Sequence, residues 1–192
     1  MILAAGGSAR LGRPKQLLPF RGRSLLRHAA ETALESVCRP VVVVLGAKAE
    51  RLEVELNGLA VKVVNNPEWA SGMGSSIWAG VKAMGLVGDG EANIDGVVIM
   101  LCDQPLISAR QLNELVAAQS VRSKGIVTAE YGGMAGVPAL FSRAYYGELA
   151  TLGAGEGAKR IILKHADDVE RVRCPEGAID IDTEADYGEL QA

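Results

Sequence analysis

Cysteine is scarce in this sequence, and no segment is apolar enough to enter a membrane. Cys38, Cys102 and Cys174 lie far apart and form no CxxC pair, so neither a disulfide framework nor a zinc site is predicted. No apolar run approaches the ~18 residues of a membrane span, and the N-terminus lacks the regions of an export signal. These absences predict a cytoplasmic protein with no membrane partner. The first strand begins so abruptly that we expect a few residues ahead of Met1.

Aromatic residues and excess positive charge are also lacking. With two Phe, two Trp and four Tyr among 192 residues, the core must come from Val, Ile, Leu and Ala, which suits an α/β protein with buried parallel strands. The formal net charge of −3 argues against a basic surface for nucleic acid but permits a local cationic pocket. The composition therefore leaves a small anionic ligand as an open possibility.

Strand and helix patterns alternate along the chain, which is long enough for one domain with a full core. Val41–Leu45 is a β-branched run typical of a strand buried on both faces. The alternation predicts an α/β fold over 1–192, with a doubly wound, mostly parallel, Rossmann-like sheet and helices on both faces. The expected strands are Met1–Ala4, Val41–Leu45, Val61–Val64, Gly96–Leu101, Gly125–Ala129, one ending at Phe141, Val169–Cys174 and Ala178–Ile181. The expected helices are one capped by Ser24 and reaching Val37, Ala47–Leu56, Gly74–Met84, one capped by Ser108 and Gln111 and reaching Ser120, Ser142–Leu152, Glu156–Lys164, and one opened by Thr183 and Asp186, with a surface loop at Gly85–Asn93.

The segment that follows the first strand is rich in glycine and in cations. The glycines of Gly6–Gly12 let the backbone approach a ligand closely and point its N–H groups at phosphate oxygens. Arg10, Arg13 and Lys15 would add positive charge. The order of residues is neither a Walker A loop nor a G-x-G-x-x-G dinucleotide fingerprint. The segment is interpreted as a phosphate-wrapping loop, with a surface turn carrying solvated cations as the alternative.

Two carboxylates are candidates for a metal site. Asp103 follows an apolar strand, at the end of an α/β sheet where ligands bind. Asp180 and Asp182 alternate with isoleucines, so both would project from one face of a short strand. If that strand lies against the main sheet, Asp103 and Asp182 converge into a set of hard oxygen ligands that suits Mg²⁺. The simpler interpretations are a strand-end turn for Asp103 and a helix-flanking residue for Asp182.

The stretch "NNPEWASGMGSSIWAG" is a third candidate. Gly72 and Gly74 bracket Met73, and Ser75 and Ser76 then enter a helix. Exposed N–H groups and hydroxyls at a helix N-terminus can bind a base, ribose or phosphate. An ordinary capped helix is the alternative. Nearby Trp69 and Trp78 could be core residues or walls of an acceptor site, and spacing does not separate these two roles.

Taken together, these stretches resemble the nucleotidyltransferases of molybdenum cofactor synthesis, which transfer NMP from an NTP. The opening matches that family's L-A-A/G-G-x-x-x-R-x-G-x-x-K signature from Leu3 to Lys15. The set "LAAG", "PKQLLPFRG", "NPEWASGMGSSIWAG", "CDQP", "GVPALF" and "DIDTEADY" is most similar to the cytidylyltransferase branch. The resemblance spans essentially the whole chain.

The resemblance implies transfer of CMP from CTP to molybdopterin, with Mg²⁺ as cofactor and pyrophosphate as the second product. It implies a nucleotide-binding half of about 1–105 and an acceptor half of about 106–192. A molybdoenzyme or its maturation factor would be a protein partner. The implied catalytic residues are Arg10, Lys15 and Asp103; the implied metal ligands are Asp103 and Asp182; and the implied nucleotide-binding residues are Leu3, Ala4, Ala5, Gly6, Gly7, Ser8, Gly12, Gly72, Gly74, Ser75 and Ser76. Ala5 favours CTP, because the guanylyl branch usually reads "LAGG" there.

Two departures from the family pattern fall in the acceptor half. The chain reads Gly136–Val137–Pro138 where the family often has Gly-His-Pro, and Gly155–Lys159 lacks an aspartate that the family often carries. A sugar phosphate or alditol phosphate is therefore an alternative acceptor. A non-catalytic protein that binds or matures the molybdenum cofactor is an alternative of another class. A nicotinamide-dependent oxidoreductase is suggested only by the doubly wound pattern, and the missing dinucleotide fingerprint argues against it.

Overall fold

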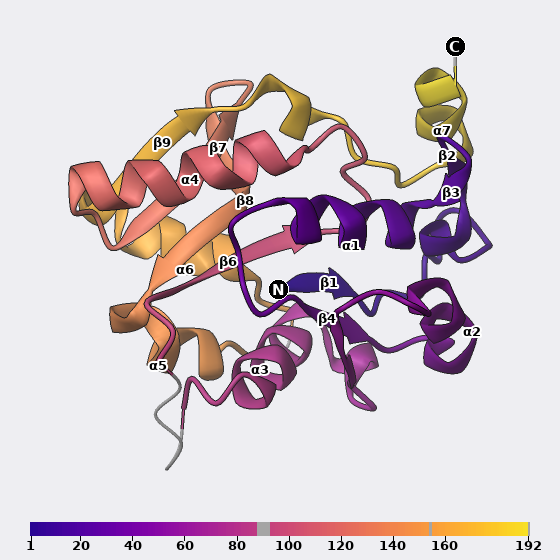
Figure 1. The fold of residues 1–192 in the computed structure, drawn as a ribbon, viewed down its shortest axis with the longest axis horizontal. Helices are drawn as coiled ribbons and strands as arrows, with labels where there is room; N and C mark the ends of the chain where they lie inside the picture. Colours follow the sequence, from indigo (N-terminus) through magenta and orange to yellow (C-terminus); the bar gives the residue numbers. More distant parts are fainter. Residues whose placement is uncertain (88–92, 154, 192) are drawn as a thin grey trace.

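The computed structural model describes residues 1–87, 93–153 and 155–191, which are built around one mixed sheet (Figure 1). Its seven strands lie in the order β5–β4–β1–β6–β8–β7–β9, and β8 runs antiparallel to both of its neighbours. The other neighbouring pairs are parallel, so the expected mostly parallel sheet is confirmed. The strands of this sheet are β1 (Ile2–Ala4), β4 (Val42–Leu45), β5 (Lys62–Asn65), β6 (Gly96–Leu101), β7 (Ile126–Tyr131), β8 (Met134–Ser142) and β9 (Val169–Arg173), while β2 (Pro19–Phe20) and β3 (Arg23–Ser24) form a separate hairpin.

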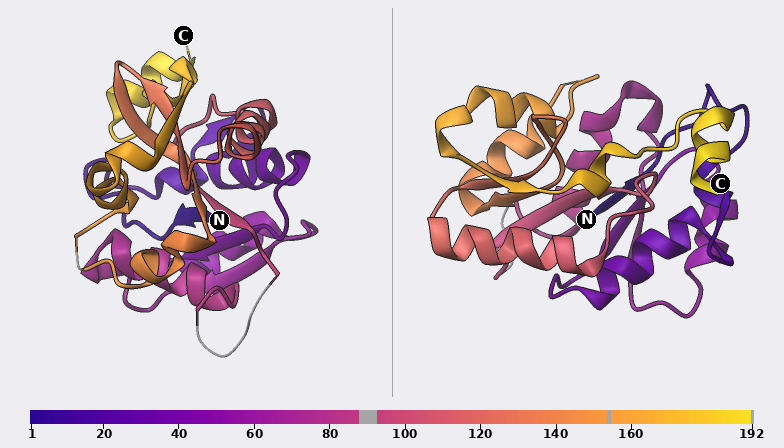
Figure 2. Two further views of the ribbon diagram at one scale, coloured as in Figure 1. Left: turned by 90° about the vertical axis from the view of Figure 1, so that its left-hand side faces the viewer. Right: turned by 90° about the horizontal axis from the view of Figure 1, so that it is seen from above.

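Helices cover both faces of the sheet, as the sequence predicts. The helices are α1 (Leu25–Glu35), α2 (Ala49–Glu53), α3 (Met73–Ala83), α4 (Ala109–Arg122), α5 (Tyr146–Ala150), α6 (Ala158–Lys164) and α7 (Glu184–Gln191). The helices α1, α2 and α4 pack on one face and α3, α5 and α6 on the other (Figure 2). Successive strand residues divide between these two cores: Val43 and Leu45 face the first, and Val42 and Val44 the second. Among the described residues, no helix combines the length and apolarity that crossing a membrane requires.

The predicted caps of three helices are confirmed. The Ser24 hydroxyl accepts a hydrogen bond of 3.2 Å from the first turn of α1, and Ser108 and Gln111 form the expected capping box of α4. At the start of α7, the Thr183 N–H donates to Asp186 (2.7 Å) and the Asp186 N–H donates back to the Thr183 hydroxyl (3.2 Å). Each cap satisfies backbone donors that have no partner inside the helix.

The prediction of a strand at Ala178–Ile181 is wrong. A 3-10 helix, η6 (Pro175–Ala178), precedes an extended segment that joins no ladder. The alternation of isoleucines misled the prediction, because Ile181 is buried but Ile179 is 43% exposed. The Ile181 N–H instead donates to the main-chain oxygen of Asp103 (3.0 Å), so this segment still lies against the end of β6.

Two expected helices are shorter than predicted. The segment from Ala47 to Leu56 divides into α2 and a tighter 3-10 turn, η2 (Val54–Leu56). The helix expected over Ser142–Leu152 begins later, because Ser142 ends β8 and a 3-10 turn, η4 (Arg143–Tyr145), precedes α5. In the loop predicted at Gly85–Asn93, residues 88–92 lie outside the described residues.

The sheet opens where β8 meets β6. The two strands pair from Gly96↔Ser142 to Ile99↔Ala139, and the pairing then stops although β6 continues to Leu101. On its other side β8 pairs with β7, with a register shift between Thr128 and Ala129 that leaves two extra residues, Val137 and Pro138, in β8. A bulge of this kind bends its strand locally. It lies where β8 departs from β6, at the carboxyl end of β6.

Candidate nucleotide and metal site

The loop after β1 is held in shape by its own chain. Ser8 and Gly12 have positive φ angles of 54° and 71°, a conformation that glycine adopts readily and serine rarely. The buried Gln16 amide donates to the main-chain oxygens of Ala4 (3.0 Å) and Gly6 (2.8 Å). Sequence reasoning missed Gln16, and its place directly after Lys15 in "PKQL" was the available signal. The loop is therefore pre-shaped by a side chain that does not itself carry charge.

Ser8 has a structural role in this loop. Its hydroxyl accepts a hydrogen bond from the Lys15 N–H (3.1 Å) and donates to Gln16 (3.4 Å). These contacts fix the backbone of Lys15 relative to the start of the loop. The Lys15 side chain is consequently aimed back across the end of β1 toward β6.

The Lys15 ammonium lies between the two predicted metal ligands. It hydrogen-bonds to Asp103 and donates to Asp182 at 2.8 Å, and Arg10 donates to the other oxygen of Asp182 at 2.6 Å. The sequence expectation that Asp103 and Asp182 converge is therefore met, although not through a strand. Lys15 and Asp103 are largely buried, with 15% and 11% of their side chains exposed, so water screens this ion pair weakly.

The pKa values of the cluster follow from these contacts. Burial lowers the pKa of Lys15, but the charges and hydrogen bonds of Asp103 and Asp182 more than offset burial, so the pKa is raised. The hydrogen bond from Lys15 lowers the pKa of Asp182, helped by the charge of Arg10. Burial and the nearby charges of Asp182 and Asp103 raise the pKa of Asp180. The cluster thus holds an ammonium and ionised Asp182 together at neutral pH.

The carboxylate pair suits a divalent cation that arrives with phosphate. The Oδ1 atom of Asp103 is buried and has no hydrogen-bond partner among the described residues. An orphaned carboxylate oxygen of this kind has a lone pair available for a ligand. In the described residues no group of three or more His, Cys, Asp or Glu side chains could hold a metal. Mg²⁺ commonly takes only one or two carboxylates and completes its shell with water and substrate phosphates, so Asp103 and Asp182 fit it.

A cleft of about 330 Å³ opens beside this cluster, at the carboxyl ends of β1 and β6. Trp69 forms one wall and packs closely on two glycines, because a Cβ atom would lie 2.4 Å from Trp69 at Gly46 and 3.2 Å at Gly7. Trp69 is thus a cleft wall rather than a core residue. The predicted site residues that line the cleft are Leu3, Ala4, Ala5, Gly6, Gly7, Lys15, Gly72, Ser76 and Asp103.

Other predicted nucleotide residues lie outside the lining of the cleft. Ser8 and Gly12 shape the loop. Gly74 is buried where a Cβ would lie 2.5 Å from the main-chain oxygen of Gly153, so it permits close packing at the start of α3. The single Ser75 hydroxyl hydrogen is within hydrogen-bond distance of the main-chain oxygens of Gly72 (2.8 Å) and Glu68 (2.9 Å), so Ser75 fixes the helix entry.

Asn66 organises the same helix entry and was missed from the sequence. It is buried, and its amide donates to the hydroxyls of Ser75 (2.9 Å) and Ser76 (3.0 Å). Its position immediately after β5, in "NNP", was the available signal. Trp78, the other tryptophan, is 44% exposed and packs with Lys82, away from the cleft lining.

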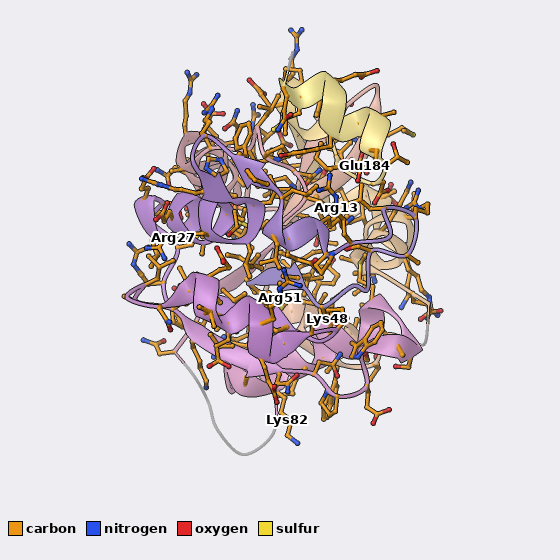
Figure 3. The ribbon with its side chains drawn as sticks, turned by 90° about the vertical axis from the view of Figure 1, so that its right-hand side faces the viewer. Arg13, Arg27, Lys48, Arg51, Lys82 and Glu184 are labelled. Atoms are coloured by element: carbon orange, nitrogen blue, oxygen red, sulfur yellow. The ribbon has the colours of Figure 1, made fainter. Side chains whose placement is uncertain are left out.

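The C-terminal helix is tied to the cationic loop. Arg13 donates to both carboxylate oxygens of Glu184 at 2.8 and 2.7 Å, and the two side chains lie together at the base of α7 (Figure 3). The Tyr187 hydroxyl donates to the main-chain oxygen of Pro19 (2.8 Å). Together with the hydrogen bond from Arg10 to Asp182, these contacts hold the segment that carries Asp182 against the loop. Arg13 is therefore engaged by Glu184, while Arg10 and Lys15 contact carboxylates that were predicted as metal ligands.

A further cavity, of about 280 Å³, adjoins the cleft. Both are lined by Leu3, Met73 and Leu101. Its other walls come from the bulged part of β8, from Tyr131 and from α6. We call it the bulge chamber, defined by the lining residues Leu3, Met73, Ile99, Leu101, Tyr131, Met134, Ala135, Gly136, Val137, Gly155, Gly157, Ala158, Lys159 and Ile162.

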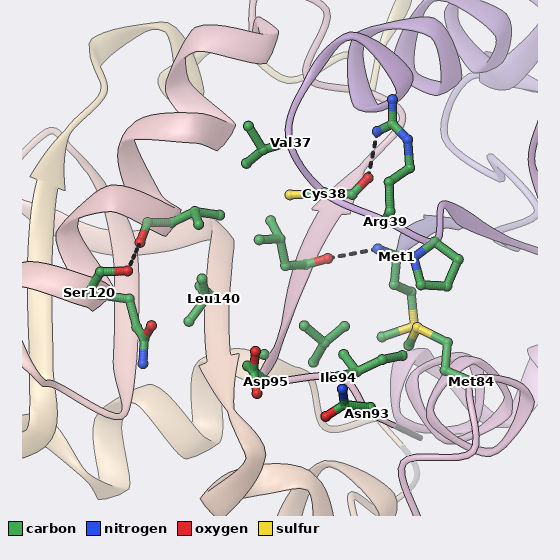
Figure 4. Close-up of a pocket in the computed structure, with 16 residues that line it drawn as sticks. Met1, Val37, Cys38, Arg39, Met84, Asn93, Ile94, Asp95, Ser120 and Leu140 are labelled. Atoms are coloured by element: carbon green, nitrogen blue, oxygen red, sulfur yellow. Dashed lines mark hydrogen bonds between the residues drawn. The ribbon is translucent and has the colours of Figure 1, made fainter. Parts of the chain in front are cut away.

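A cavity at the opposite end of the sheet holds none of the predicted chemistry. It has a volume of about 330 Å³ and lies at the amino ends of β1 and β6, between Met1, Cys38, Met84 and Leu140 (Figure 4). Among the described residues lining it, no predicted site residue occurs. Ligands of open α/β sheets bind at the carboxyl ends of the strands, so the cleft beside Asp103 is the functional candidate.

Known proteins are similar to this chain in sequence and in fold. Over residues 1–169 the chain matches the MobA-like NTP transferase domain. Nicotine blue oxidoreductase of Paenarthrobacter nicotinovorans is 35% identical over 173 residues, covering 85% of this chain and 80% of the relative. Purine catabolism protein PucB of Bacillus subtilis (strain 168) is 30% identical over 173 residues, covering 84% and 78%.

Among solved structures, Rv0371c from Mycobacterium tuberculosis H37Rv superposes with a TM-score of 0.80 at 28% identity, covering 100% of this chain and 96% of that one. Rv0371c has also been solved in complex with manganese, and that structure gives a TM-score of 0.79 at 26% identity. The family match covers most of the chain, and it includes the glycine loop, Lys15 and Asp103. The chain belongs to the family of MobA-like NTP transferase domains.

Proposed function

We propose that this protein transfers CMP from CTP to the terminal phosphate of molybdopterin and releases pyrophosphate. The observation that carries the proposal is the Lys15 ammonium held between Asp103 and Asp182 at the mouth of a glycine-walled cleft. A triphosphate and its metal need a cation, two hard oxygen ligands and a close-approaching backbone. Membership of the NTP transferase family supports the reaction type. The resemblance of the motifs to the cytidylyltransferase branch supports CTP and molybdopterin.

In this proposal Asp103 and Asp182 hold Mg²⁺, and Arg10 and Lys15 hold the triphosphate. When bound, the metal would neutralise charge on the phosphates. With the carboxylates engaged by the metal, the donors of Lys15 and Arg10 would be available to the phosphates of the nucleotide. The small side chains of Ala4 and Ala5 and the glycines of the loop let the nucleotide lie against the backbone.

The reaction needs little acid or base assistance from the protein. An oxygen of the acceptor phosphate, already deprotonated, forms a bond to the α-phosphorus of CTP, and the bond from that phosphorus to the β-phosphate oxygen breaks. Pyrophosphate leaves with the electron pair, and Lys15 and Arg10 stabilise its charge. Catalysis then consists of in-line positioning and charge neutralisation. We assign nucleotide binding to about 1–105 and acceptor binding to about 106–192 of a single domain, with Asp182 crossing back to the first half.

Pyrophosphate release tests the proposal directly. CTP, GTP, ATP and UTP are each assayed with Mg²⁺ against molybdopterin, sugar phosphates and alditol phosphates. We expect release to be fastest with CTP and molybdopterin, with formation of the cytosine dinucleotide. Faster release with a sugar or alditol phosphate would reassign the acceptor, and tight cofactor binding without release under any nucleotide would indicate a carrier or maturation protein.

An oxidoreductase is the second candidate, favoured by the 35% identity to nicotine blue oxidoreductase. The described cleft argues against it, because its charged groups suit a triphosphate and the loop lacks a dinucleotide fingerprint. Oxidation of NADH or NADPH in the presence of a quinonoid dye is the matching assay. Turnover there, with no pyrophosphate release from any nucleotide, would replace nucleotidyl transfer by hydride transfer.

A further inference from the structure

Gln104 follows Asp103 directly, and its side chain is buried behind the end of β6, with 5% of the residue exposed. The two hydrogens of its amide group donate to the main-chain oxygens of Val137 (3.1 Å) and Gly177 (2.9 Å). Its amide oxygen is buried and has no hydrogen-bond partner among the described residues. Because an unpaired buried acceptor costs free energy, the residue is best explained by what its two donors hold in place.

The two donors connect segments that are far apart in the sequence. Val137 is one of the extra residues of β8 and lines the bulge chamber. Gly177 belongs to η6, in the connection that leads from β9 to α7, and lies 73 positions beyond Gln104. Gln104 therefore joins the end of the strand that carries Asp103 to the start of the segment that carries Asp182.

The segment between Gly177 and Asp182 is anchored at both of its ends. At Gly177 a Cβ atom would lie 2.7 Å from the ring of Tyr131, so the glycine lets η6 pack closely against that ring. At the other end Ile181 is buried, and its N–H donates to the main-chain oxygen of Asp103 (3.0 Å). The position of Asp182 relative to Asp103 is thereby fixed through the main chain.

These anchors differ from the ion pairs that Asp182 makes. The extended segment joins no ladder among the described residues, so strand pairing does not align it. Asp182 contacts Lys15 and Arg10, but in the proposed function those cations are needed by the triphosphate. The hydrogen bonds made by Gln104 and by the Ile181 N–H involve no group that the substrate or the metal would engage, so they can persist throughout the reaction.

We propose that Gln104 is a positioning residue for the metal site: through Gly177 it keeps Asp182 close enough to Asp103 for both carboxylates to hold one divalent cation. Gln104 does not touch the metal in this role. Loss of a residue that orients metal ligands typically lowers metal affinity by about 10- to 100-fold. The inference rests on the proposed nucleotidyl transfer, which supplies the reason for a metal at these carboxylates.

Binding of Mn²⁺ alone, without nucleotide, tests the inference. Mn²⁺ prefers the same oxygen ligands as Mg²⁺, and electron paramagnetic resonance measures its free concentration. Gln104→Met keeps the length of the side chain and removes both donors, so we expect Mn²⁺ to bind at least about tenfold more weakly. In turnover the same variant should need more Mn²⁺ but regain the wild-type kcat when the metal is saturating. Unchanged Mn²⁺ affinity in the folded variant would overturn the inference.

Tyr131→Phe is the matched control. It removes the other hydrogen bond to the Val137 oxygen (3.2 Å) but leaves the ring and the contact between Gln104 and Gly177, so Mn²⁺ affinity should equal that of the wild type. An equal loss in both variants would assign the effect to the bulge of β8 and would contradict a role through Asp182. If Gln104→Met does not fold, Gly177→Ala decides: the added Cβ displaces η6 and should weaken Mn²⁺ binding, and wild-type affinity there would refute the link.

A double variant shows whether Gln104 acts through Asp182. Asp182→Asn weakens Mn²⁺ binding by itself, because it removes the charge of one ligand. Adding Gln104→Met to Asp182→Asn should then weaken binding by less than about twofold more, since two changes to one interaction are not additive. Losses that multiply in full would show that Gln104 affects the metal by another route, which overturns the assignment.

The two proposals fail differently. If Gln104→Met weakens Mn²⁺ binding but no nucleotide releases pyrophosphate, the positioning role stands and nucleotidyl transfer is wrong. If pyrophosphate is released while Gln104→Met binds Mn²⁺ as the wild type does, or while the wild type binds none, the reaction stands and Gln104 does not position the metal ligands.

Discussion

Two cavities of about 330 Å³ lie at opposite ends of the same central strands, β1 and β6. The one at the carboxyl ends holds an ammonium, a buried carboxylate and a loop with positive φ angles. The one at the amino ends also carries charge, on Arg39 and Asp95. Its Arg39 side chain, however, donates to main-chain oxygens, and the rest of its lining includes Met1, Cys38, Pro40 and aliphatic residues. Equal volume thus accompanies very different chemistry. The direction of the strands, rather than the size of a hollow, determines where function can be built in this fold.

The largest effect is expected on the rate of pyrophosphate release, when a carboxylate at the carboxyl ends of the strands is compared with one at their amino ends. Asp103→Asn should reduce the rate of pyrophosphate release by about 10³-fold, because it removes a full charge from the metal site. Asp95→Asn is the matched control: Asp95 lines the amino-end cavity and is exposed, so its rate should stay within twofold of wild type. Steady-state kinetics with thermal unfolding as a check on folding measures both. Comparable losses in the two variants would remove the distinction between the cavities.

Removing a cation should affect activity at one end of the sheet and stability at the other. Lys15→Ala should lower kcat by about 10²-fold, the usual loss when one positioned donor to developing charge is removed. Arg39, at the amino end, donates to the main-chain oxygens of Ser36 (3.0 Å) and Cys38 (2.7 Å). Arg39→Ala should therefore lower the Tm by about 2–4 °C and leave kcat unchanged. A normal kcat in Lys15→Ala would remove Lys15 from the catalytic assignment.

The smallest effect concerns Asp182, in the charged cluster, and Asp180 beside it. The pKa of Asp182 is lowered, chiefly by the Lys15 hydrogen bond, so ionised Asp182 stabilises the fold above the unfolded pKa of about 3.9, and this stabilisation is lost as the pH falls through the folded pKa. The pKa of Asp180 is raised, first by burial and then by Asp182 and Asp103, so its ionisation at neutral pH opposes folding.

Neutralising each aspartate should therefore shift the Tm at pH 7 in opposite directions. Asp180→Asn should raise it by about 1 °C, and Asp182→Asn should lower it. Both differences should shrink in acid, where the carboxyls are protonated in the wild type as well. Melting curves measured from pH 3 to pH 7 check the signs. A Tm lowered by Asp180→Asn at pH 7 would contradict the charge repulsion inferred in the cluster.

Local patterns in the sequence were sufficient to place most of this fold. The run Val42–Leu45 is buried at every position and forms a central strand, and the caps at Ser24 and Ser108 begin helices as expected. The failures arise from long-range pairing. The insertion of β8 between β6 and β7 depends on contacts across the sheet that no local periodicity encodes, and the same is true of the unpaired segment ending at Ile181.

The candidate site was predicted only in part, because its geometry also depends on long-range contacts. Asp103 could be placed at a strand end from its apolar neighbours. Its convergence with Asp182 was expected from a strand at Ala178–Ile181, but it arises instead from an extended segment that joins no ladder. That Lys15 would lie between them could not be inferred from the chain, because it depends on the path of the loop. Gln16 sets that path through two main-chain carbonyls. Its place directly after Lys15 was a signal that the residue is part of the loop, but it did not show which main-chain oxygens the side chain would reach.

The contact between Lys15 and Asp182 joins residues separated by 167 positions. Closing so long a loop is entropically costly and slow compared with the local pairing of neighbouring strands and helices. The sheet and its two cores do not depend on this contact, so we expect the groups proposed for catalysis to come together late in folding.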